Sequence, residues 1–128
     1  YAWDAGFDAY TVIFANKRWA AAHPEQTRAF LEIYIRGWND YLFGDPTPAH
    51  ELMKQVNAKN TDAFLDYSRQ MIIDERLVIG RENGSPEQIG RVSVERFQTQ
   101  IDQLKSLGIL NPDSPLTVAE VVTTQYLP

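Results

Sequence analysis

Apolar positions in this chain recur mainly at three- and four-residue steps, the spacing of amphipathic helices. The longest such pattern begins at Pro24, which suits a first helical position, and is closed by Gly44 and a Gly-Asp-Pro turn. Its apolar positions are Ala29, Phe30, Ile33, Tyr34, Gly37, Trp38, Tyr41 and Leu42. We interpret the aromatic stripe from Phe30 to Tyr41 as core that packs against a large opposing surface, in preference to a ligand box.

The same spacing predicts further helices downstream. One helix starts at Thr47 and Pro48 and ends near Asn57, and a second is capped by Asn60 or Thr61. The inner face of the second helix carries Phe64, Leu65, Ser68, Met71 and Ile72. A third helix runs from about Ser93 to Leu107, with Gly108 as its stop, and Thr117 and Glu120 have capping-box spacing before a short last segment. The short stretch Leu77–Gly80 is either a turn or a strand stub.

A single β signal precedes the helices. Residues Tyr10 to Phe14 are all β-branched or aromatic, and they run into an alanine-rich helical segment. A lone strand leaves its backbone donors and acceptors without a ladder partner. We therefore expect a mainly α chain with one short strand, whose remaining sheet is provided by other polypeptide.

Composition and charge exclude several classes of protein. The chain has 128 residues, 44% hydrophobic and 23% charged, as is typical of one soluble globular domain or part of one. Its net charge is −5 and it has no run of Lys or Arg, which argues against nucleic acid and anionic membranes as partners. No apolar run is long enough to span a membrane. Because the chain opens at Tyr1 without a methionine, we expect it to be processed or cut from something longer.

Little in the sequence points to catalysis. The absence of cysteine excludes thiol catalysis, disulfides and cysteine-based zinc sites. His23 and His50 have no partner at metal-ligand spacing, so we assign them surface or capping roles and expect no metal and no cofactor. Carboxylate pairs such as Asp74 with Glu75 are interpreted as solvated surface. We expect no catalytic residue, and the chain is not predicted to be an enzyme.

The opening stretch YAWDAGFDAY remains as a candidate site. Its aromatic residues Tyr1, Trp3, Phe7 and Tyr10 are interleaved with Asp4 and Asp8 around Gly6. Aromatic faces with a few polar groups line small-molecule clefts. The alternative is a loop that tucks its aromatic rings into the core. The residues that either touch ligand or act as a hinge are Trp3, Asp4, Phe7, Asp8 and Tyr10.

The order of segments resembles a known family. The pieces HPE…RAFL…GW, IG…ERF…L…LGIL and T.QYLP occur in the order found in the carboxy-terminal part of ABC-importer substrate-binding proteins of the NMT1/THI5-like (SsuA/THI5) family. The similarity covers nearly the whole chain. It implies part of a periplasmic-binding-protein type II fold, in which two α/β lobes hold ligand between them. Residues 1–16 would form a crossover (hinge) loop and strand, and residues 17–128 the helical carboxy-terminal part of the first lobe.

This resemblance implies a function and partners. The parent protein would be periplasmic or otherwise extracytoplasmic, and would deliver nitrate, a sulfonate, taurine or a pyrimidine thiamine precursor to an ABC permease. The strand's partners would lie in an amino-terminal half that is absent here. Without that half the aromatic stripe stays exposed, so we expect self-association or a retained partner. The alternatives are part of a THI5-like pyrimidine phosphate synthase and an independent helical interaction module.

Overall fold

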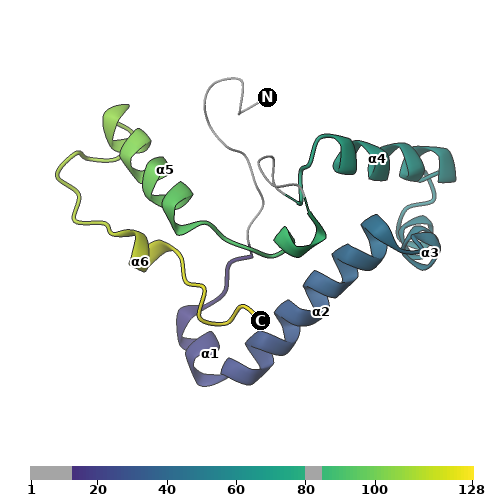
Figure 1. Ribbon diagram of the computed structural model, residues 1–128, viewed down its shortest axis with the longest axis horizontal. Coiled ribbons are helices and arrows are strands. Elements are labelled where there is room, and N and C mark those ends of the chain that lie inside the picture. Colours follow the sequence, from purple (N-terminus) through teal and green to yellow (C-terminus); the bar gives the residue numbers. More distant parts are fainter. Residues whose placement is uncertain (1–12, 80–84) are drawn as a thin grey trace.

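The structure, a computed structural model, describes residues 13–79 and 85–128. Its elements are α1 (Lys17–Ala22), α2 (Pro24–Phe43), α3 (Thr47–Val56), α4 (Asp62–Asp74), the 3₁₀ helix η2 (Pro86–Gln88), α5 (Val94–Ser106) and α6 (Val118–Val121). Figure 1 shows α2 along one side of the molecule, with α1 and the last residues of the chain near its first turns and α3 and α4 at its far end. The arm formed by α5 and α6 lies across from α2 (Figure 1).

The predicted helices are confirmed, largely at the predicted caps. Pro24 opens α2 and Gly44 is its C-cap, with the Gly44 N–H bonded to the Asp40 carbonyl. Thr61 and Ser93 each accept a backbone N–H through the side-chain oxygen, at the starts of α4 and α5. Gly108, with φ of 68°, follows the end of α5 in the left-handed conformation that glycine tolerates.

The alanine-rich segment forms a separate helix, α1, rather than part of a longer one. The Asn16 side chain accepts the N–H groups of Arg18 and Trp19 at 3.0 and 3.1 Å, which caps the first turn. His23 then leaves the helical conformation, with φ of −131° and ψ of 59°, because it precedes Pro24 and a helical residue there would clash with the proline ring. The break lets α1 fold back onto α2.

The predicted strand is wrong where the structure describes it. Ile13 and Phe14 lie in irregular backbone, and no strand occurs within residues 13–79 and 85–128. Tyr10 to Val12 lie outside the described residues. Ile13 and Phe14 have exposures of 42% and 93%, so these side chains gain nothing from burial here. The stretch at Leu77–Ile79 is a turn, while Gly80 is outside the description.

The main core is small and lies where the end of α2 meets the turn after α4. Leu42, Ile79 and Ile89 are buried together, and half-buried hydrophobic side chains surround them. The surrounding residues are Ile35, Trp38, Tyr41, Ile72, Ile73 and Val78. This cluster fixes the positions of α2, α4 and the η2 turn relative to one another.

An arginine on α4 ties that helix to the end of α2. Arg69 Nε donates to the Tyr41 carbonyl at 2.7 Å, and Arg69 Nη2 donates to the Leu42 carbonyl at 2.5 Å. These carbonyls belong to the last turn of α2, where backbone acceptors lack helical partners and the helix dipole favours a cation. Arg69 therefore satisfies two such acceptors and holds the α2–α4 corner.

Much apolar surface is left uncovered. The accessible area over the whole chain is 9324 Å², against about 6,900 Å² for a compact monomer of this mass. Large hydrophobic side chains are exposed on most described helices, and they include Phe30 at 55%, Ile33 at 60%, Val56 at 82% and Phe64 at 55%. Phe64 was predicted to face the core, and this assignment is wrong. Phe30 belongs to the stripe that was expected to stay exposed without the missing half. Leu65, beside Phe64, is buried as predicted.

Candidate functional site

A broad groove of about 1320 Å³ opens on one side of α2. One of its walls is α2 itself. The others come from residues 13–20, the turn after α4, the segment from Gln88 to Phe97 and the carboxy-terminal residues 119–127. The groove thus lies between α2 and the α5–α6 arm that Figure 1 shows apart from it.

The α2 wall of the groove is aromatic. Phe30, Tyr34 and Trp38 follow one another at four-residue steps and therefore stack along one helix face. Ring centroids are 6.2 Å apart for Phe30 and Tyr34, with nearly parallel planes, and 6.4 Å apart for Tyr34 and Trp38, edge to face. Both arrangements are favourable for aromatic pairs. The rings of the aromatic stripe, which was predicted to be core, thus stack along the helix, but they border the groove.

The remaining lining gives the groove a basic character. Among the described residues that line it, four side chains are basic and two are acidic, whereas the chain as a whole has a net charge of −5. The basic residues are Lys17, Arg76, Arg91 and Arg96, and the acidic ones are Glu95 and Glu120. An occupant with apolar or aromatic surface and some negative charge suits this lining best.

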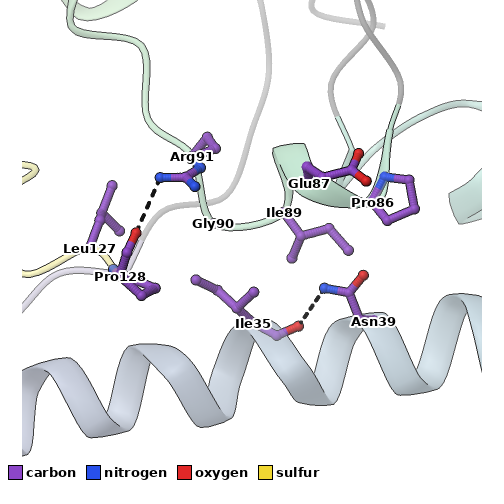
Figure 2. A pocket seen from close by; sticks show the side chains of 9 residues that line it. All are labelled: Ile35, Asn39, Pro86, Glu87, Ile89, Gly90, Arg91, Leu127 and Pro128. Carbon is purple, nitrogen blue, oxygen red and sulfur yellow. Dashed lines mark hydrogen bonds between the residues drawn. The ribbon is translucent and has the colours of Figure 1, made fainter.

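A smaller pocket of about 320 Å³ adjoins the groove at the middle of α2. Figure 2 shows its residues, which come from α2, from η2 with the loop after it, and from the end of the chain. They are Ile35, Asn39, Pro86, Glu87, Ile89, Gly90, Arg91, Leu127 and Pro128. Ile35, Ile89 and Leu127 supply apolar walls, and Asn39, Glu87 and Arg91 supply polar groups.

The floor of this pocket depends on a close approach of backbone to helix. Gly90 has φ of 77° and lies so near Ile35 that an added Cβ would come within 2.5 Å of the Ile35 Cδ1 and Cγ1 atoms. Only glycine combines this backbone conformation with this lack of volume. The contact brings the loop onto α2 and leaves Ile89, next to it, 2% exposed.

The polar groups of the pocket have fixed roles. Asn39 Nδ2 donates to the Ile35 carbonyl at 3.0 Å, and Arg91 Nη1 donates to the Pro128 carbonyl at 3.3 Å (Figure 2). A hydrogen bond from the Ser85 side chain, reinforced by one from backbone, lowers the pKa of the exposed Glu87 carboxyl. Glu87 is therefore a carboxylate at neutral pH, and Arg91 is a cation.

His50 occupies a different environment from the predicted one. Its side chain is buried on α3, its ring centroid is 5.7 Å from that of Tyr41, and its Nδ1 lies 3.8 Å from Asp66 Oδ1. The surface or capping role predicted for His50 is thus wrong, because α3 folds back against the α2–α4 corner. His23 occupies the N-cap position of α2, but its side chain makes no capping hydrogen bond, and its ring centroid lies 4.9 Å from that of Trp19.

Tyr41 shares this corner. Burial raises the pKa of its phenol above the ordinary value; the nearby Arg69 lowers that pKa, and Asp66 raises it. The aromatic stripe of α2 therefore continues from Trp38 through Tyr41 to His50. At this corner, residues of α2, α3 and α4 contact one another.

The residues predicted to touch ligand or act as a hinge, Trp3, Asp4, Phe7, Asp8 and Tyr10, lie outside the described residues. In the part that is described, no three His, Asp or Glu side chains gather in a way that could hold a metal ion. None of the described helices has both the length and the hydropathy needed to cross a membrane.

Two features of the site were missed by sequence reasoning. Gly90 was not singled out in the sequence, although its neighbour Ile89 is one of the most buried described residues. The segment TTQYLP was recognised as a terminal motif but not as a wall of the groove, to which Tyr126 and Leu127 contribute. Glycine after a Pro-led turn indicates a turn, but it does not indicate which helix that turn lies against.

Comparison with known proteins adds no relative: no protein-family model, no curated protein and no solved structure matches this chain.

Proposed function

We propose that this chain is the helical carboxy-terminal part of the first lobe of an extracytoplasmic solute-binding protein for an ABC importer. The resemblance described above, to the NMT1/THI5-like (SsuA/THI5) family, motivates the proposal. The observation that supports it most is the aromatic wall of α2, which borders a groove instead of a core. A lobe of the two-lobe α/β fold has helices packed on a sheet, and the groove is the face on which that sheet would pack.

The size of the groove favours polypeptide over a small ligand as its occupant. Small-molecule pockets have volumes of about 300–1,000 Å³, and the groove has about 1320 Å³. The six hydrophobic residues buried in the described part of the chain form a meagre core for a domain of this length. A sheet laid on the α2 wall would cover Phe30, Tyr34 and Trp38 and complete that core.

In the completed protein, ligand would bind between the lobes, near the crossover to which residues 1–16 are assigned. Ligand contacts both lobes in the closed state and one in the open state, so it shifts the population toward closure. The permease then recognises the closed form. Nitrate, sulfonates, taurine and pyrimidine thiamine precursors are the ligand classes to try.

The first test measures the association of the chain alone. We expect oligomers by size-exclusion chromatography with light scattering, together with binding of the dye ANS to the exposed aromatic wall. Phe30→Ala should reduce ANS binding severalfold. Phe64→Ala is the matched control, because both phenylalanines are helical and 55% exposed, but Phe64 lies outside the groove.

A different result would reject the proposal. If the chain is a monomer that melts cooperatively and binds no ANS, the groove needs no sheet and an independent helical module is the better description. The second test is a thermal-shift assay of the complete protein, encoded with whatever precedes Tyr1, against the four ligand classes. A shift with none of them removes the transport assignment while leaving the fold assignment to the first test.

A further inference from the structure

The last residues of the chain form a wall of both cavities. Residues 123–128, which we call the carboxy-terminal strap, run from α6 toward α2 (Figure 1). Gln125, Tyr126 and Leu127 of the strap line the groove, and Leu127 and Pro128 line the smaller pocket. The strap therefore lies where the two cavities adjoin.

The boundary between the cavities consists of the residues that line both. They are Ile35, Ile89, Gly90, Arg91 and Leu127. Ile35 is part of α2, Ile89 is buried in the main core, and Gly90 packs against Ile35. Leu127, by contrast, is half-buried and lies outside the helices and outside the core cluster. Movement of Leu127 would therefore join the smaller pocket to the groove and leave the rest of the boundary in place.

Two arginines connect the strap to the body of the protein. Arg28 Nη2 donates to the Gln125 carbonyl at 3.5 Å, and Arg91 Nη1 donates to the Pro128 carbonyl at 3.3 Å (Figure 2 shows the second bond). Both hydrogen bonds are exposed, and both are longer than the usual distance of about 2.9–3.0 Å. Segments held by exposed hydrogen bonds open at low free-energy cost.

The strap keeps a shape of its own. The Leu127 N–H donates to the Thr124 carbonyl at 3.0 Å, and the Gln125 N–H donates to the Thr123 hydroxyl at 3.3 Å. Both bonds lie within the strap, so neither has to break when the strap leaves the arginines. Val122, at the end of α6, is in extended backbone and gives the strap a point about which to turn.

We propose that the carboxy-terminal strap is a releasable partition between the groove and the smaller pocket. When it is closed, Arg28 and Arg91 hold its carbonyls and Leu127 separates the two cavities. When it is released, the groove and the pocket form one continuous site along α2. The two guanidinium groups are then available to acceptors of an occupant that extends from the groove into the pocket.

This inference does not rest on the proposed function. Release of the strap involves described residues of this chain alone, and it is measured with nothing bound in the groove. A strap that opens is compatible with failure of the transport assignment, and a strap that stays closed is compatible with its success.

Thiol accessibility measures the release, because the chain has no cysteine of its own. Leu127→Cys places one thiol on the strap, and Val121→Cys, at a position of α6 that is 46% exposed, gives the rate of an open thiol. We expect Ellman's reagent to modify the thiol at position 127 severalfold more slowly than the thiol at 121. Substituting both Arg28→Gln and Arg91→Gln should raise the rate at 127 about tenfold.

A matched control removes the same charge elsewhere. Arg18→Gln with Arg36→Gln also deletes two cations, at exposed positions of α1 and α2 that line neither cavity, and should leave the rate at 127 unchanged. Urea denaturation then shows whether release is local. If the arginine pair variant loses enough global stability to explain its faster reaction, or if its rate equals that of the parent, the proposal is overturned.

The neutral dye Nile red tests the partition in the chain that keeps Leu127. Joining the two cavities enlarges the apolar site, so the Arg28→Gln and Arg91→Gln pair should bind the dye severalfold more tightly than the parent does. The Arg18→Gln and Arg36→Gln pair should bind it as the parent does. Equal affinity of the parent and the strap variant overturns the proposal, because release would then open nothing.

Discussion

Gly90 lies against the side chain of Ile35, so close that a Cβ on the glycine would be 2.5 Å from two carbon atoms of the isoleucine. The contact joins the loop after η2 to the middle of α2, and it forms the floor of the smaller pocket. A side chain at this position is excluded both by the positive φ of Gly90 and by the Ile35 atoms that fill the space beside it.

Gly90→Ala should therefore lower the free energy of unfolding by about 3 kcal/mol, the sum of left-handed strain and overpacking. Urea denaturation followed by circular dichroism measures this free energy.

Two other glycines separate the effect of backbone strain from that of overpacking. Gly108→Ala has the strain without the contact and should cost about 1–2 kcal/mol, while Gly37→Ala, in open space within α2, should stabilise by about 0.5–1 kcal/mol. Equal effects at Gly90 and Gly108 would show that Ile35 yields freely.

Arg69→Met should loosen the corner between α2 and α4. The substitution leaves the Tyr41 and Leu42 carbonyls without their charged donor, and we expect a loss of about 2–3 kcal/mol in the free energy of unfolding. Arg36→Met, on the exposed face of α2, is the control and should change stability by less than about 0.5 kcal/mol. A loss at Arg69 no larger than at Arg36 would mean that water replaces the guanidinium at no cost.

Tyr41 should make the protein sensitive to alkaline pH. Burial raises the pKa of its phenol in the folded state, so the neutral form is favoured there. The contribution to stability is complete below the unfolded pKa of about 10 and is lost as pH rises through the folded pKa. Denaturation curves from pH 9 to 12 should show this loss, and Tyr41→Phe should reduce it. Tyr67→Phe, 65% exposed on α4, should not.

The stability of the last helix, α6, should fall at acidic pH because of Glu120. Its carboxylate accepts the Thr117 backbone N–H and hydroxyl, both at 2.9 Å, and these bonds lower the pKa of the Glu120 carboxyl. The stability from this capping box is present above the unfolded pKa and is lost as pH falls through the folded one. Carboxyl NMR titration should place Glu120 below an ordinary glutamate, and Thr117→Ala should return it toward that value. An unchanged titration in the variant would contradict the hydroxyl bond alone, because the backbone N–H at position 117 still donates to Glu120.

Local signals in the sequence predicted the helices well. Thr61, Ser93 and Thr117 cap helices at the predicted positions because capping depends on one side chain and the backbone two or three residues away. Periodicity also indicated correctly which face of α2 is aromatic. It could not indicate whether anything covers that face, since the cover is a property of distant or separate polypeptide.

Non-local contacts account for the errors. The burial of His50 depends on α3 turning back toward Tyr41 and Asp66, and nothing in the short polar sequence around His50 indicates that turn. Phe64 and Leu65 are adjacent on α4, and both were expected to be buried. Adjacent residues of a helix point in different directions, and only the Leu65 side chain lies on the buried face of α4. The smaller pocket likewise joins residues from three separate parts of the chain.

The aromatic wall of α2 also has a spectroscopic consequence. Of the three tryptophans in the chain, Trp19 and Trp38 line the groove. Whatever comes to fill that space displaces water from both indoles and moves their fluorescence to shorter wavelength. Tryptophan fluorescence is thus an intrinsic, label-free probe for any occupant of the groove.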